Sequence, residues 1–91
     1  MDRQACFREN LRFLRQRRKL TQEALSGTLG ISRVKLKAIE TGQTMTISLT
    51  DAVAIAQYFK LPIDVLLSRR LAKLGELEIR VIEADYKPLA N

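Results

Sequence analysis

Residues 33 to 41 carry the side chains with the clearest chemistry in this sequence. Leu36 and Ile39 are spaced to face one side of a helix. The outward positions of that helix are Arg33, Val34, Lys37, Ala38 and Thr41. The guanidinium of Arg33 matches the two acceptors on the major-groove edge of guanine, whereas Val34 and Ala38 suit contact with a thymine methyl group. Lys37 reaches a base or a phosphate. The residue types therefore favour base contacts in duplex DNA, with a phosphate contact or a solvated charge as the alternatives for Arg33.

The elements that must position these side chains lie between Thr21 and Gly42. Thr21 and Ser32 are residue types that cap helix N-termini, and Gly30 and Gly42 stand where two short helices must end. Small Ser26 lets the two helices approach closely. The apolar residues at inward positions of this segment are Leu25, Leu29, Ile31, Leu36 and Ile39. This spacing predicts two helices held at an angle across a tight turn that contains Ile31.

This pair of helices resembles the helix-turn-helix of the lambda-repressor-like (Cro/CI, Xre) family of bacterial and phage regulators. The resemblance runs from about Leu11 to Leu67, through LRFLRQRRKLTQ and SLTDAVAIAQYFKLPIDVLL. It implies an all-α, five-helix domain that inserts the helix at about Ser32–Thr41 into the major groove of a palindromic operator as a dimer. It also aligns Arg33, Val34, Lys37 and Ala38 with base-facing positions. We therefore expect a sequence-specific transcriptional regulator, and a repressor in particular.

Other polar residues are expected to contact backbone phosphates. In the family a glutamine at the start of the first helix of the pair takes this role, which Gln22 matches unless it is simply solvated. The full set of expected phosphate contacts is Gln22, Ser32, Lys35, Thr41, Gln43, Thr44 and Thr46. Lys35 lies toward the flank of its helix and has either role. Relatives often carry Lys or Arg in the loop after Gly42, and its neutral residues here predict weaker, less salt-dependent phosphate binding.

Arg15 and Glu40 are interpreted as structural. The family places an arginine late in the first helix against a glutamate late in the helix that enters the groove, the recognition helix (here about Ser32–Thr41), and both residue types occupy the matching positions here. We expect them to form an ion pair that fixes the recognition helix. Breaking a partly buried pair of this kind leaves a charge without compensation.

The charge of the chain is unevenly distributed. Of the 16 basic residues, 14 lie at or before Lys73, but only 6 of the 10 acidic residues do. A basic head suits phosphate contact, whereas the acidic tail is not expected to lie on DNA. For Arg17, Arg18 and Lys19, phosphate contact and a solvated helix end remain equal alternatives.

The composition disfavours several other classes of function. The 91 residues contain no histidine and a single cysteine, Cys6, which we expect to be partly buried. We therefore expect no enzyme activity, no metal site and no cofactor. No apolar run is long enough to span a bilayer, and the N-terminal residues lack the apolar core of a secretory signal. A cytoplasmic protein of bacterial or phage origin is expected.

The rest of the domain is predicted to be helical. Phe7, Leu11 and Leu14 predict a first helix ending near Lys19, and Ser48 caps a fourth. The expected buried face of that fourth helix is Leu49, Ala52, Val53, Ala56 and Phe59. Pro62 begins a fifth helix. Its apolar stripe is Ile63, Leu66, Leu67, Leu71 and Leu74, ending at Gly75.

We divide the chain into a DNA-binding domain (1–74) and a C-terminal arm (75–91). Leu77, Ile79 and Val81 alternate with charged residues, which predicts a short strand over 77–82. A lone strand needs a partner, so we expect these residues to dimerise with a second copy, as in Cro-type strand exchange. The alternatives are a linker or disordered end and a surface for a different protein. In the last case the protein is an antitoxin or interaction module whose DNA binding is autoregulatory.

Overall fold

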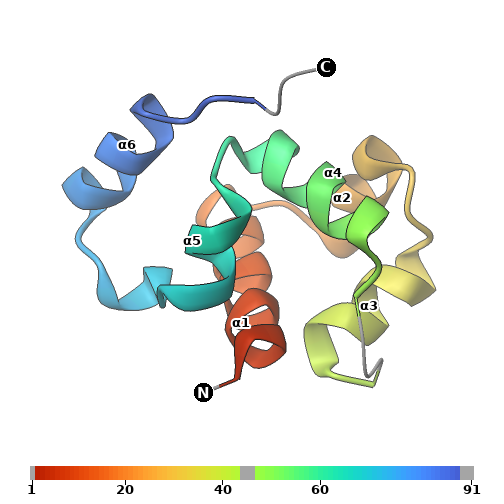
Figure 1. Ribbon diagram of the computed structural model, residues 1–91. Helices are drawn as coiled ribbons and strands as arrows, with labels where there is room; N and C mark the ends of the chain where they lie inside the picture. The colour runs from red at the N-terminus through yellow and green to blue at the C-terminus, as the bar shows by residue number, and fades with distance from the viewer. Residues whose placement is uncertain (1, 44–46, 89–91) are drawn as a thin grey trace.

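The computed structural model describes residues 2–43 and 47–88, and within these residues every regular element is helical (Figure 1). The elements are α1 (Arg3–Arg17), α2 (Gln22–Leu29), α3 (Arg33–Thr41), α4 (Leu49–Phe59), α5 (Ile63–Ser68), the short 3₁₀ helix η1 (Leu71–Lys73) and α6 (Glu76–Ala84). The all-α class and the five expected helices are confirmed. None of the helices in the described ranges has the length and apolarity needed to cross a membrane.

The helices begin and end where the local sequence directs. The side chains of Thr21, Ser32 and Ser48 each accept a hydrogen bond from the backbone N–H three residues later, at 3.0 to 3.1 Å. Gly30 and Gly42 end α2 and α3 with φ angles of 71° and 81°, a left-handed conformation that glycine adopts without steric cost. These caps confirm the predicted boundaries of the helix pair.

Helix α1 runs through the middle of the molecule (Figure 1), and its apolar stripe of Phe7, Leu11 and Leu14 is almost fully buried. The other buried members of the core come from every element up to η1: Leu25, Ile31, Leu36, Ile39, Ile55, Ala56, Phe59, Leu61, Leu66 and Leu71. Cys6 is also buried, and its burial raises the pKa of the thiol. The core therefore joins the helix pair to the rest of the chain as one unit.

The buried face of α4 differs from the prediction. Leu49 is 75% exposed, whereas Ile55 is fully buried beside Ala56 and Phe59. Asp51 is also buried and forms an ion pair with Lys35 of α3 at 2.7 Å. The apolar spacing identified the helix correctly but placed the centre of its inward face too close to Leu49.

A buried polar side chain ends α5 earlier than predicted. The amide nitrogen of Asn10 donates to the carbonyl oxygens of Leu66 and Arg69 at 2.9 and 2.8 Å, and its amide oxygen accepts from the Leu71 N–H at 3.0 Å. These backbone groups lie in the last turn of α5, at its C-cap and at the first residue of η1. Because Asn10 satisfies them, the expected continuous stripe to Leu74 is interrupted, and Leu71 packs from the separate helix η1.

The predicted C-terminal strand is wrong, because residues 76–84 form helix α6. Alternation of Leu77, Ile79 and Val81 matched a strand, but only Ile79 is buried, while Leu77 and Val81 are 78% and 55% exposed. Ile82, three residues after Ile79, packs against the core. This spacing of three is helical, and packing against the domain overrides the β preference of these residues.

Ion pairs attach α6 to the C-terminal ends of α1 and α5. Arg17 binds the carboxylates of both Glu76 and Glu83, and Arg69 binds Glu78 at 2.8 Å. The hydrogen bonds from Arg17 lower the pKa of the Glu76 carboxyl.

The Arg18 guanidinium lies over the rings of Tyr58 and Phe59, 5.3 and 4.9 Å from their centroids. Arg17 and Arg18 therefore have internal structural roles, which their place in a basic run does not indicate.

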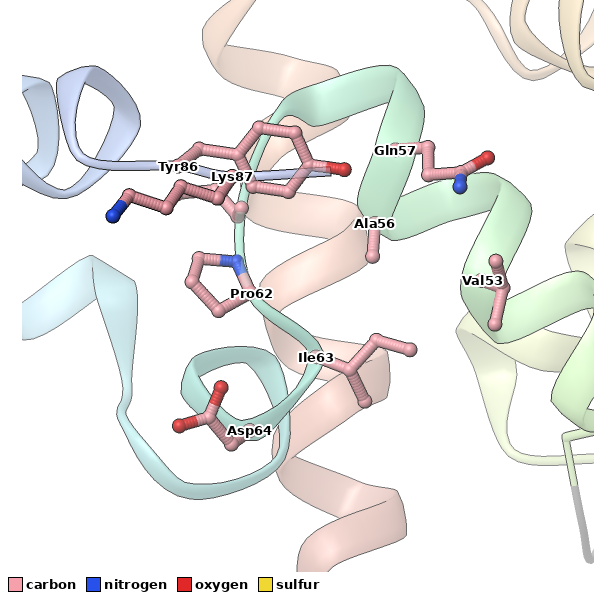
Figure 2. A pocket seen from close by; sticks show the side chains of 9 residues that line it. Val53, Ala56, Gln57, Pro62, Ile63, Asp64, Tyr86 and Lys87 are labelled. Atoms are coloured by element: carbon pink, nitrogen blue, oxygen red, sulfur yellow. The ribbon is translucent and has the colours of Figure 1, made fainter. Parts of the chain in front are cut away.

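The segment after α6 returns to the domain at the start of α5. Tyr86 and Lys87 lie beside Pro62, at a hollow of about 210 Å³ toward which Ala56 and Ile63 also point (Figure 2). The described part of the tail, up to residue 88, therefore packs against the domain instead of extending away from it.

We predict that Asn10→Leu lowers the free energy of unfolding by about 1–3 kcal/mol or more, because it leaves two carbonyls and one N–H buried without partners. Chemical denaturation measures the change. Gln16→Leu, at an exposed position of α1, is the matched control and should change stability by no more than about 0.5 kcal/mol. Equal effects of the two substitutions would contradict the role given to Asn10.

Candidate nucleic-acid interface

Helices α2 and α3 are joined by a turn of three residues, Gly30 to Ser32. Ile31 is 6% exposed, and its N–H donates to the Ser26 carbonyl at 3.2 Å. Ser26 is itself buried. The turn thus places an apolar side chain between the two helices, with a small residue on α2.

A buried ion pair fixes α3 against α1. Arg15 donates from Nε and Nη2 to the two carboxylate oxygens of Glu40, at 2.8 and 3.0 Å, and from Nη1 to the Leu20 carbonyl at 2.8 Å. The side chains of Arg15 and Glu40 are 14% and 2% exposed. Gln22, at the start of α2, donates to Glu40 at 3.2 Å. One carboxylate thereby connects α1, α2 and α3.

The sequence was compared with protein families, curated proteins and solved structures. A family model for a helix-turn-helix domain matches residues 9–71, which is well over half of the chain. The protein belongs to this helix-turn-helix DNA-binding family. No curated protein and no solved structure matches it significantly. The match begins in α1 and ends in η1, so the helix-turn-helix domain includes Asn10 and all of its backbone partners.

The outward face of α3 in this helix-turn-helix domain presents the expected base-contacting residues together. Val34 is 81% exposed, Arg33 and Lys37 are exposed, and Ala38 is half-buried. Leu36, Ile39 and Glu40 occupy the opposite, buried face. Arg33 also lines a hollow of about 430 Å³ with residues 21–23 at the start of α2. Arg33 therefore lies on the exposed face of α3, next to the N-terminal end of α2.

The residues expected to contact phosphate lie in different settings. Gln22 is bonded to Glu40, Lys35 is paired with Asp51, and the Ser32 hydroxyl caps α3. The Thr41 hydroxyl donates to the Lys37 carbonyl at 2.9 Å. Gln43 is exposed. Thr44 and Thr46 lie outside the described residues. In this structure, therefore, four of these side chains already have partners within the helix-turn-helix domain.

Two arginines of α1 next to the recognition helix were not identified from the sequence. Arg8 and Arg12 line a hollow of about 320 Å³ together with Thr41 and Gly42 at the end of α3. Their spacing from Arg15, seven and three residues, places all three on one side of α1. The sequence alone could have indicated this arrangement, because Arg15 was already expected to pair with Glu40 of α3. Nothing in the sequence, in contrast, indicated the pairing of Lys35 with Asp51.

We predict that Arg15→Met lowers the free energy of unfolding by about 3–5 kcal/mol, because Glu40 is left buried without its counter-charge. Thermal or chemical denaturation measures the loss. Arg80→Met is the matched control, since the Arg80 side chain is 71% exposed on α6. Adding Glu40→Gln to Arg15→Met removes the buried charge and should restore part of the stability. A single variant no less stable than the control would show that the pair does not hold α3.

Proposed function

We propose that this helix-turn-helix protein is a sequence-specific transcriptional regulator of the lambda-repressor-like kind, which represses by occupying a palindromic operator as a dimer. Helix α3 enters the major groove with Arg33, Val34, Lys37 and Ala38 toward the base edges. No catalytic role, cofactor or metal is part of this proposal. The protein acts in the cytoplasm of a bacterium, or is encoded by a phage.

The observation that supports this proposal best is the combination of residues on the outward face of α3. Val34 is 81% exposed between two cationic side chains, Arg33 and Lys37. A site that binds only phosphates gains nothing from an exposed valine. A site that reads bases can use it, because a valine side chain makes apolar contact with the methyl group of thymine. The face thus combines an arginine that can donate hydrogen bonds to guanine with an apolar side chain, both at the N-terminal end of α3.

The experiment is repeated selection from random duplexes at near-physiological salt, with the native protein and with Arg33→Ala. We expect a palindrome whose half-sites lie about one helical turn apart. Arg33→Ala should lose the preference for a guanine in each half-site, a change worth about 1–3 kcal/mol of discrimination.

The control for this selection is Lys60→Asn. It removes one positive charge at the C-terminal end of α4, away from α3 (Figure 1), and asparagine tolerates the left-handed backbone of this position. The control should select the same sequence as the native protein. If Arg33→Ala weakens binding to all sequences equally, Arg33 contacts a phosphate. If the native protein enriches no sequence, the proposal of a sequence-specific regulator fails.

The dimer proposed for a palindromic site needs a surface other than the predicted strand. Leu77 and Val81 lie one turn apart on α6 and are its largest exposed apolar side chains, whereas Ile79 is buried within the domain. Helix α6 lies across the molecule from α3 (Figure 1), so a partner bound there leaves the reading face open. We propose that two copies pair through Leu77 and Val81.

We predict that replacing both Leu77 and Val81 with Glu converts a dimer into a monomer, because four like charges then meet across a two-fold interface. Sedimentation equilibrium measures the change, and far-UV circular dichroism checks that the fold is retained. Leu49→Glu, at another exposed apolar position, is the control and should stay dimeric. A native protein that is monomeric at all concentrations would reject this interface and favour a different protein as the partner of α6, as in an antitoxin.

A further inference from the structure

The sequence that follows α3, from Gln43 to Thr46, has no cationic residue, but the fold brings two cations from α1 to the end of α3. Arg8 and Arg12 line the hollow of about 320 Å³ that also contains Thr41 and Gly42. The Arg8 side chain lies beside Gly42, with its Nε atom 3.8 Å from where a Cβ atom of that residue would stand. Two arginines are therefore close to the C-terminal end of the recognition helix.

The charges around this hollow leave an excess of positive charge. Two carboxylates also line it, but Glu40 is bonded to Arg15 and Glu9 is bonded to Arg70, at 2.9 and 3.0 Å. Arg12 is exposed and makes no ion pair with any residue in the described part of the chain. Both carboxylates thus accept hydrogen bonds from an arginine, Glu40 from Arg15 and Glu9 from Arg70.

The end of a helix is normally a poor place for an anion, because the last carbonyls carry a partial negative charge. A phosphate can approach Thr41 only if nearby cations outweigh that effect. Arg8 and Arg12 supply such cations, and a guanidinium binds phosphate oxygens through two parallel hydrogen bonds. With these arginines beside it, the C-terminal end of α3 can bind a phosphate.

We propose that Arg8 and Arg12, with the end of α3 at Thr41 and Gly42, form a binding site for a backbone phosphate of the DNA duplex. This inference rests on the proposed function, since it places a phosphate beside an α3 that lies in the groove. It assigns to α1 a contact that was expected from neutral residues of the loop. The site sets the position of α3 on the duplex and carries no sequence preference.

The test is the dependence of DNA affinity on salt concentration, measured by fluorescence anisotropy with the native protein, Arg12→Gln and Arg12→Lys. Removal of one cation from a phosphate should reduce the slope of log K against log [salt] by about 0.9. We expect this reduction in Arg12→Gln, and a doubled reduction when Arg8→Gln is added. Arg12→Lys should retain the slope, because the charge remains. Lys60→Asn, which removes a charge at the end of α4, should also retain it.

Several results would overturn the site. An unchanged slope in Arg12→Gln, or an equal decrease in Lys60→Asn, would mean that Arg12 does not bind a phosphate. A changed base preference in selection would mean that Arg12 reads a base instead. Arg12 is exposed, so its variants should fold, and a thermal melt checks this. The salt slopes are measured on both a selected and a scrambled duplex. If the protein shows no sequence preference, the proposed regulator is refuted, but the salt slope on the scrambled duplex still tests whether Arg12 binds a phosphate.

Discussion

The orientation of the recognition helix depends on one carboxylate, that of Glu40. Buried to 2% exposure, it receives two hydrogen bonds from Arg15 and a third from Gln22. A buried charge is tolerated only when its partners are in place, so the three helices that supply these groups must adopt a single relative arrangement. Apolar packing of Leu36 and Ile39 alone is less directional. The ion pair thereby converts a hydrophobic contact into a defined angle for the outward face of α3.

The sequence predicted the helix pair well because its signals are local. Thr21 and Ser32 at N-caps, and Gly30 and Gly42 at left-handed positions, act within a few residues of themselves, and the structure has all four where expected. The contact of Arg15 with Glu40, 25 residues apart, came only from the resemblance to a known family. Spacing alone gives the face of a helix but not its partner on another element.

The tail was predicted wrongly for a related reason. The alternation of Leu77, Ile79 and Val81 is ambiguous over so short a segment. The contacts that hold α6 on the domain are distant in sequence, as with Arg17, which lies 59 residues before its partner Glu76. From the sequence, the same arginine is only a candidate phosphate ligand or a solvated charge. The acidic tail thus pairs with Arg17 and Arg18 at the C-terminal end of α1, whereas Arg8, Arg12 and Arg15 lie on the side of the helix that faces α3. The uneven charge of the sequence thus corresponds to a division between two groups of arginines on one helix, one paired with the tail and one facing α3.

The hydrogen bonds of Asn10 affect when the domain can fold during its synthesis. The backbone partners of Asn10, Leu66, Arg69 and Leu71, are 56 to 61 residues later in the sequence. During synthesis α1 leaves the ribosome before these partners, and the polar amide in its apolar stripe does not have all three of them until Leu71 has emerged. Burial of α1 before that point is unfavourable. The domain should therefore fold late, as a single cooperative unit, instead of adding one helix at a time to a growing core.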